Sequence, residues 1–172
     1  MENYTKYQLK SNEELASLLE GKDNLYVIAC NKCFKEFDTI DEPDCDEFLK
    51  FAAEQGKTVT GSTKVDFLCN KMHTERKLQD LFPEGTENVI VISCGLGIQT
   101  VAELAGKPVY AASNSLNYRG HHGMALTKKS CDACAQCYLN ITGGVCPIVD
   151  CSKSLVTVSY THLRAHETLA NL

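Results

Sequence analysis

The stretch "ENVIVISCGLGIQTVAELAGKPVYAAS", residues 87–113, decides the fold. It opens with a continuous apolar run rich in β-branched residues, which is typical of a strand buried on both faces. A short helical pattern follows and stops at Gly106, and a second apolar run begins after Pro108. A strand, a helix and another strand in this order predict neighbouring strands of a parallel sheet.

The chain before this stretch shows the same alternation of strands and helices. Ser11 and Glu14 have the spacing of a capping box, and leucines on one helical face follow until Gly21 provides a stop. Further elements are predicted at residues 24–30 (strand), 45–56 (helix), 57–69 (one or two short strands) and 75–82 (helix). The sequence therefore predicts an α/β fold, with a three-layer, mostly parallel sheet, for residues 1–112.

The character of the sequence changes near Ser113. Residues 113–156 are polar and contain five of the ten cysteines in the chain. Because such a segment buries little apolar surface, we predict a largely irregular, cysteine-rich segment that is ordered by a bound metal.

The final residues, 157–172, differ again from what precedes them. The stretch "VSYTHLRAHET" resembles the translation of one reading frame of a transposon-based sequencing adapter. We therefore interpret everything from Thr157 as a non-native tail, exclude it from reasoning about the fold, and expect the native portion to end near Val156.

Composition and charge argue against two classes of binding partner, nucleic acids and membranes. The net charge is -5 over 172 residues, and the basic residues are scattered rather than clustered, which argues against nucleic acid. No apolar run is long enough to cross a bilayer, and the N-terminus lacks the pattern of a signal peptide. We expect a cytoplasmic protein that binds neither nucleic acid nor membranes and uses its cysteines for metal rather than disulfides.

Five cysteines in the polar segment form the first candidate site, and four of the five would hold one cluster: Cys131, Cys134, Cys137, Cys146 and Cys151. The first three have the spacing C-x-x-C-x-x-C, which lets one loop wrap three corners of an iron–sulfur cluster, and Cys146 precedes a proline. Structural zinc more often uses two separated C-x-x-C pairs. The spacing favours iron–sulfur, 4Fe–4S by type, and leaves zinc as the alternative.

Four further cysteines follow predicted strands and form a second candidate site: Cys30, Cys33, Cys69 and Cys94. The carboxyl ends of parallel strands line one edge of a sheet, so these thiols could converge on a metal there. Alternatively, Cys69 and Cys94 are small buried residues of the core. Cys45 is interpreted as incidental. The glycines of "SCGLG" are interpreted as allowing the backbone to approach a ligand or cluster.

The stretches "SCGLGIQTVAEL", "KPVYAASNSL" and above all "CDACAQCYLNITGGVCPIVDCSKSL" resemble the cysteine-rich subunit or C-terminal domain of methylenetetrahydrofolate reductases. The resemblance covers about residues 8–156. It implies an α/β protein that carries one or two iron–sulfur clusters, or zinc in some members, and that partners a flavin-containing reductase subunit. By position, it implies the nine cysteines of the two candidate sites as ligands.

Two departures from the family pattern leave the ligand assignment open. The family continues after "CSKSL" with "NGPCGG", whereas the adapter-like tail stands here. The family's first cysteine pair is also often followed by a third cysteine, where this chain has Phe37.

Three functions follow from these observations. The leading one is an iron–sulfur electron-transfer subunit of a methylenetetrahydrofolate reductase complex, with a further electron-donor subunit as a second candidate partner. It assigns no catalytic residue to this chain. The second is a structural zinc module that scaffolds the same complex. The third is a small redox enzyme that uses Cys30 and Cys33 as a dithiol, because a C-x-x-C motif lowers thiol pKa values; it ranks last because no helix start follows the motif.

Overall fold

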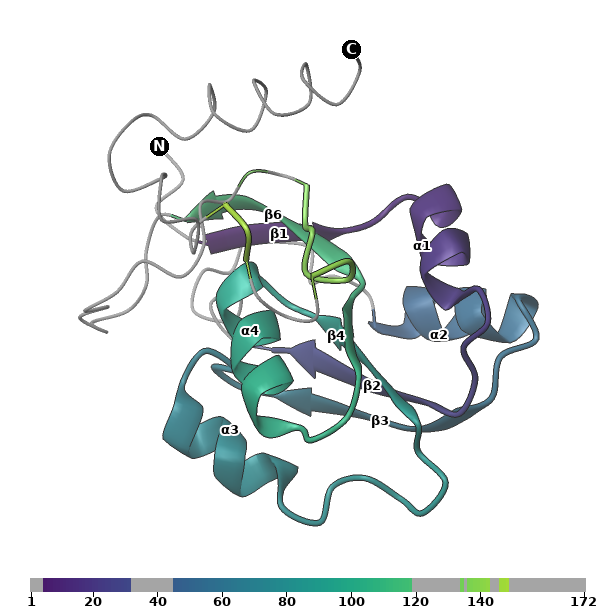
Figure 1. Ribbon diagram of the computed structural model, residues 1–172, viewed down its shortest axis with the longest axis horizontal. Coiled ribbons are helices and arrows are strands. Elements are labelled where there is room, and N and C mark those ends of the chain that lie inside the picture. Colours follow the sequence, from purple (N-terminus) through teal and green to yellow (C-terminus); the bar gives the residue numbers. More distant parts are fainter. Residues whose placement is uncertain (1–4, 32–44, 119–133, 135, 143–145, 149–172) are drawn as a thin grey trace.

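The computed structural model describes residues 5–31, 45–118, 134, 136–142 and 146–148. In chain order these form β1 (Thr5–Leu9), α1 (Asn12–Leu19), β2 (Leu25–Cys30), α2 (Cys45–Glu54), β3 (Val59–Val65), α3 (Lys71–Leu78), β4 (Asn88–Ile92), α4 (Gly95–Leu104), β5 (Val109–Ala111) and β6 (Ser113–Tyr118) (Figure 1). Strands and helices alternate from β1 to β5, which confirms the predicted α/β fold.

The main sheet has four parallel strands in the order β3-β2-β4-β5. Its central pair is β2 and β4, whose register places Tyr26 beside Val89 and Ile28 beside Val91. Nearly all side chains of these two strands are buried. A strand covered on both faces has no polar side, which is why each reads as a continuous apolar run.

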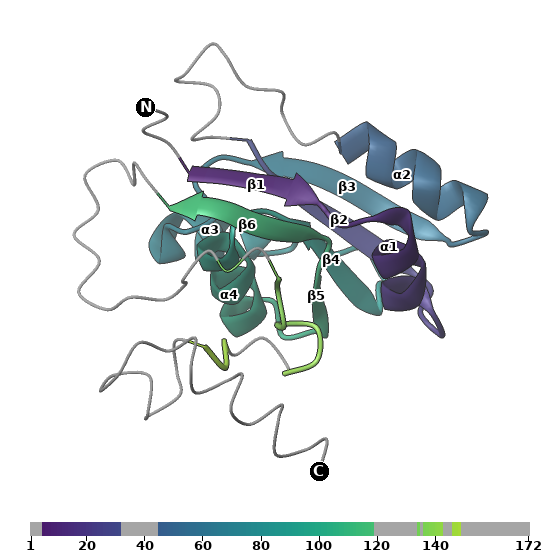
Figure 2. The same cartoon turned by 90° about the horizontal axis from the view of Figure 1, so that it is seen from above.

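Helices cover both faces of this sheet, as Figure 2 shows. The core on one face, called the α1–α2 core, includes Leu15, Leu18, Leu19, Val27, Phe48, Ile90 and Ile92. The core on the opposite face, called the α3–α4 core, includes Tyr26, Ile28, Leu78, Val91, Ile98 and Val101. Successive residues of β2 and β4 point into alternate cores, as the pleat of a strand requires. The arrangement is the predicted three-layer sandwich.

The two central strands leave the sheet toward opposite faces. The chain continues from β2 into α2, which packs on one face, and from β4 into α4, which packs on the other. Since β2 and β4 are neighbours, the direction of winding reverses between their carboxyl ends. Open α/β sheets bind ligands in the crevice at such a switch point.

A second, two-stranded sheet pairs β1 with β6 in antiparallel register, with Gln8 opposite Asn114 and Leu9 opposite Ser113. This ribbon was not predicted: residues 113–156 were expected to be mostly irregular, yet the first six of them form β6. The sequence of β6, "SNSLNY", is too polar to give the apolar alternation of a strand. Its strand conformation comes from pairing with β1.

Two helices begin elsewhere than predicted. The helix expected at residues 75–82 runs over Lys71–Leu78 instead, because the Asn70 side chain accepts a hydrogen bond from the His73 N–H at 3.1 Å and caps an earlier start. The glycines of "SCGLG", expected in a turn, lie in the first turn of α4, with Cys94 as the N-cap residue.

The helices of the described part of the chain are short. The longest, α2 and α4, have 10 residues each. A bilayer-spanning helix needs about 20 apolar residues, and none of the described helices has the length or the apolar character to cross a membrane.

Candidate functional site

Three cysteines, here called the edge thiols, lie at the carboxyl edge of the main sheet. Cys30 is the last residue of β2, Cys94 is the N-cap residue of α4 and follows β4 after Ser93, and Cys69 lies in the loop between β3 and α3. Burial, together with smaller contributions from the nearby thiols of Cys94 and Cys30, raises the pKa of the Cys69 thiol to about 12. The three side chains are therefore close enough to interact electrostatically at the switch point of the sheet.

Hydrogen bonds hold the backbone near Cys30, at the end of β2, and near Cys69, after the end of β3. The buried hydroxyl of Tyr7, in β1, donates to the carbonyl oxygen of Cys30 at 2.8 Å. The Asn31 N–H donates to the carbonyl oxygen of Val65 at 3.1 Å and joins the end of β2 to the end of β3. Beside Cys69, the buried Thr74 hydroxyl donates to the carbonyl oxygen of Leu68 at 3.0 Å.

The chain around Cys94 is held by two serines of β6. The Ser113 hydroxyl accepts from the Ser93 N–H at 2.9 Å and donates to the Ser93 carbonyl oxygen at 2.7 Å. The Ser115 hydroxyl accepts from the Gly95 N–H at 2.8 Å. Both residues that flank Cys94 are thus tied to one strand, so the β4–α4 junction has a fixed backbone.

Three more cysteines, here called the cavity thiols, line a small cavity of about 20 Å³ beside the amino end of α4: Cys134, Cys137 and Cys146. Gly95 and Gln99 of α4 and Ser115 of β6 line the same cavity. Cys137 and Cys146 also pack against the α3–α4 core. Because Gly95 adjoins Cys94, the edge thiols and the cavity thiols approach the same helix end.

The segment that carries the cavity thiols is attached to the core through asparagines and two apolar side chains. The Cys137 N–H donates to Asn114 Oδ1 at 3.0 Å, and the Ala111 N–H donates to Asn140 Oδ1 at 2.7 Å. Leu139 and Ile148 are buried. These attachments account for the placement of residues 136–142 against β5 and β6.

The structure brings six of the nine candidate ligands into these two groups. Cys33, Cys131 and Cys151 lie outside the described residues, as does the tail from Thr157. Among the described residues, no three His, Cys, Asp or Glu side chains stand in the arrangement of a metal-ligand set. The division of ligands between two metal sites therefore stays a prediction.

Two further residues were interpreted from the sequence. Cys45, interpreted as incidental, is the first residue of α2, where the helix predicted at residues 45–56 begins, and it lies buried in the α1–α2 core. Gly97 was expected to let the backbone approach a ligand, yet a Cβ there would collide with the Ser93 hydroxyl and lie 3.0 Å from the Leu68 Cβ. The space beside Gly97 is therefore occupied by the side chains of Ser93 and Leu68.

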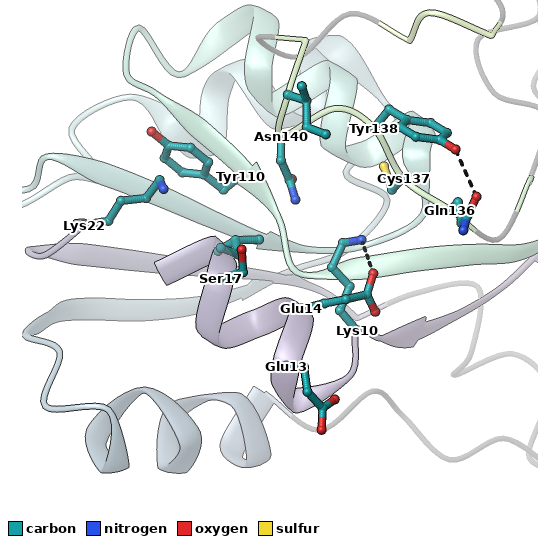
Figure 3. Close-up of a pocket in the computed structure, with 12 residues that line it drawn as sticks. Lys10, Glu13, Glu14, Ser17, Lys22, Tyr110, Gln136, Cys137, Tyr138 and Asn140 are labelled. Atoms are coloured by element: carbon teal, nitrogen blue, oxygen red, sulfur yellow. Dashed lines mark hydrogen bonds and ion pairs between the residues drawn. The ribbon is translucent and has the colours of Figure 1, made fainter. Parts of the chain in front are cut away.

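An open groove of about 610 Å³ lies on the other side of the cysteine-bearing segment, between α1 and residues 136–141 (Figure 3). Lys10 and Cys137 line it at one end, and Lys22 stands over the Tyr110 ring at 4.7 Å. Sequence reasoning did not identify Lys10 or Asn114. The available signal was the stretch "KPVYAASNSL", in which three polar residues directly follow a buried strand.

Comparison with known proteins gives one match. Residues 110–159 match the family described as "Methylene-tetrahydrofolate reductase C terminal". This segment contains β6, the cavity thiols and the stretch "CDACAQCYLNITGGVCPIVDCSKSL" that chiefly carried the resemblance, so the family recognised from the sequence is confirmed for residues 110–159. A search of curated proteins gave no match, and a search of solved structures gave none.

Proposed function

Because residues 110–159 belong to the methylenetetrahydrofolate reductase C-terminal family, we propose that this chain is the iron–sulfur electron-transfer subunit of such a reductase. Its partner would be a flavin-containing subunit in which the folate is reduced. One observation carries the proposal: the edge thiols gather at the switch point of the sheet, next to a cavity lined by three further thiols.

The donor atoms at the two thiol groups suit a soft metal. Six described side chains there end in sulfur, and thiolate sulfur is the ligand of iron–sulfur clusters and of structural zinc. The edge thiols lie at the sheet edge partly or wholly withdrawn from solvent, and burial raises the pKa of the Cys69 thiol. A bound metal would take the place of the proton on such a thiol. Edge and cavity thiols would be the ligands, with Cys33, Cys131 and Cys151 completing the sets.

When bound, an iron–sulfur cluster supplies one-electron transfer. The chain itself supplies burial and a fixed backbone. Buried Cys94 and half-buried Cys69 keep water away from the site. The Tyr7 hydroxyl, which donates to the Cys30 carbonyl oxygen, and the Ser115 hydroxyl, which accepts from the Gly95 N–H, hold the backbone that carries the thiols. Such second-sphere contacts orient ligands and tune the metal.

A structural zinc module is the second candidate, and one observation favours it. Among the described residues after Tyr118, Leu139 and Ile148 are the ones that are buried. A segment with so few buried side chains gains much of its order from a bound metal, whether or not that metal is redox-active.

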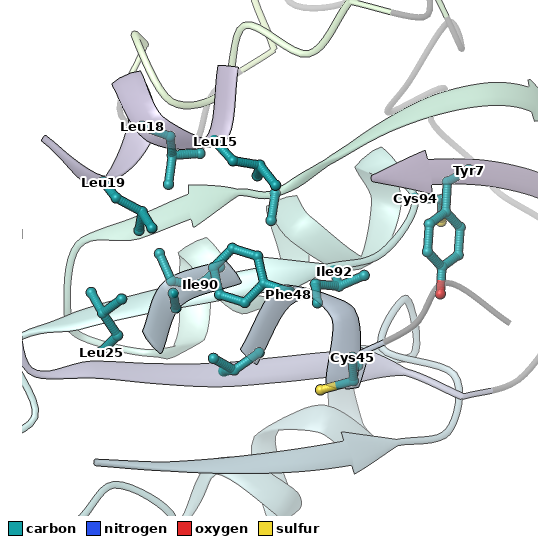
Figure 4. Close-up of a cluster of buried hydrophobic side chains, with 14 of the residues drawn as sticks. Tyr7, Leu15, Leu18, Leu19, Leu25, Cys45, Phe48, Ile90, Ile92 and Cys94 are labelled. Atoms are coloured by element: carbon teal, nitrogen blue, oxygen red, sulfur yellow. The ribbon is translucent and has the colours of Figure 1, made fainter. Parts of the chain in front are cut away.

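Metal analysis separates the two candidates. We expect anaerobically purified protein to hold about four iron and four sulfide per cluster and to absorb broadly in the visible. Cys69→Ser should lose metal from the edge thiols, and Cys137→Ser from the cavity thiols. Cys45→Ala is the matched control, because Cys45 is buried in the α1–α2 core (Figure 4) and belongs to neither group. Zinc without colour would overturn electron transfer and leave the scaffold.

A mixing experiment tests whether this chain passes electrons to the proposed flavin-containing partner. Chemically reduced protein, mixed with a flavin-dependent methylenetetrahydrofolate reductase subunit, should bleach the flavin absorbance. Cys69→Ser and Cys137→Ser should slow this reaction, whereas Cys45→Ala should not. A flavin that is reduced equally fast in the absence of this chain's metal would contradict the proposed relay.

A further inference from the structure

Lys10 is a buried lysine beside the cysteine-bearing segment. Its side chain is 5% exposed, and its ammonium group donates to Asn114 Oδ1 at 2.8 Å and to Glu14 Oε1 at 3.2 Å. Burying an ammonium group costs free energy unless hydrogen bonds and an opposite charge compensate it. The burial of Lys10 therefore indicates that this side chain has a role in addition to packing.

Asn114 connects this lysine to a cavity thiol residue. The same Oδ1 atom that accepts from the Lys10 ammonium also accepts from the Cys137 N–H at 3.0 Å. Asn114 is buried in β6, and Lys10 directly follows β1, where its N–H donates to the carbonyl oxygen of Ala112 at 3.0 Å. One carboxamide oxygen thus joins the ribbon, a positive charge and the backbone of Cys137.

The two residues of β6 that flank Asn114 make similar hydrogen bonds to backbone N–H groups, on the opposite face of the strand. Ser113 and Ser115 hold Ser93 and Gly95, the residues on either side of Cys94. Asn114 lies between them and points the other way, as alternation along a strand requires. The single strand β6 therefore sets the position of an edge thiol with one face and of a cavity thiol with the other.

We propose that Asn114 and Lys10 are positioning residues for Cys137: Asn114 fixes its backbone through Oδ1, and Lys10 orients that oxygen and places a positive charge, paired with Glu14, at the groove that Cys137 also lines. The inference rests on the proposed function in treating Cys137 as a ligand. A nearby positive charge favours the more negative, reduced state of a metal–thiolate site, so the charge raises its reduction potential.

Four variants separate the two roles. Asn114→Leu removes the acceptor, whereas Asn114→Asp keeps an oxygen acceptor and adds a negative charge. Lys10→Met removes the positive charge and keeps an unbranched side chain. Lys22→Met is the matched control, because Lys22 lines the same groove but its ammonium lies over Tyr110 and donates to the Glu20 carbonyl oxygen.

Amide hydrogen exchange on the protein as purified is the first measurement. Loss of one hydrogen bond worth about 1 kcal/mol corresponds to roughly fivefold faster exchange, and we expect this at the Cys137 amide in Asn114→Leu. Asn114→Asp should restore the wild-type rate, and Lys22→Met should leave it unchanged. An unchanged rate in Asn114→Leu would overturn the positioning role, and it would do so even if the protein binds no metal.

The midpoint potential of the metal-loaded protein is the second measurement. Lys10→Met and Asn114→Asp should both lower it, since one removes a positive charge and the other adds a negative one, while Lys22→Met should not. Equal potentials in all variants would overturn the role of the charge. A wild-type protein without a redox-active metal would instead refute the proposed function, and the exchange rates would still decide the positioning of Cys137.

Discussion

Gly97 lies in the first turn of α4, where the helix passes very close to the residue before Cys94. An added methyl group would collide with the Ser93 hydroxyl and press on Leu68. Overpacking of this kind costs about 1–3 kcal/mol, so we expect Gly97→Ala to lower the free energy of unfolding by that amount. Urea denaturation of the metal-free chain measures it, and an unchanged midpoint would show that α4 can shift to accommodate the methyl group.

The buried hydroxyl of Ser93 leads to a second prediction at the junction of β4 and α4. Within the described part of the chain its side-chain oxygen is buried without a hydrogen-bond partner. An unsatisfied buried hydroxyl costs about 1–3 kcal/mol. We expect Ser93→Ala to be neutral or to stabilise the metal-free protein, and the same urea experiment tests it. A clear loss of stability would mean that the hydroxyl has a partner, such as a bound water molecule.

At the scale of the element, the start of α1 depends on a reciprocal cap. The Glu14 N–H donates to the Ser11 hydroxyl at 3.3 Å, and the Ser11 N–H donates to the Glu14 carboxylate at 3.0 Å. Loss of such a cap costs about 1 kcal/mol. Ser11→Ala should therefore destabilise the protein by that amount in thermal or urea denaturation, because α1 places three leucines in the α1–α2 core.

The same cap predicts a dependence on pH. The hydrogen bond from the Ser11 N–H lowers the pKa of Glu14 below its ordinary value. A carboxyl group with a lowered pKa stabilises the fold above its unfolded pKa, and the contribution is lost as the pH falls through the folded pKa. Wild-type stability should thus decline in acid more steeply than that of Glu14→Gln. Parallel declines would contradict the contribution of Glu14.

For the whole molecule, the two cores and the cysteine-bearing segment should respond differently to loss of the proposed metal. Both cores are built mainly from residues before Tyr118 and are supported by the main sheet. Removing the metal with a chelator should therefore accelerate amide exchange in residues 136–142 and 146–148 while β2 and β4 keep their protection. Exchange that accelerates equally in both parts would show that the sheet also depends on the metal.

The main sheet, the helices α1, α2 and α4, and the candidate ligands could be predicted from the amino-acid sequence. These features are encoded locally: β2 and β4 are continuous apolar runs because both their faces are buried, and Ser11 with Glu14 specifies a helix start within four residues. The family match was predictable for the same reason, since the cysteine spacing lies within one short stretch.

The hydrogen bonds that hold the backbone around the thiols could not be predicted from the sequence, because they join segments that are distant along the chain. The strand β6 is polar and acquires its conformation by pairing with β1, which lies more than 100 residues earlier in the chain, as the Lys10–Asn114 separation of 104 positions shows. No local pattern records that Asn114 bonds Lys10 and Cys137, or that Tyr7 bonds Cys30. Such contacts depend on chain segments that meet only when the two cores have packed, so a sequence read residue by residue does not contain them.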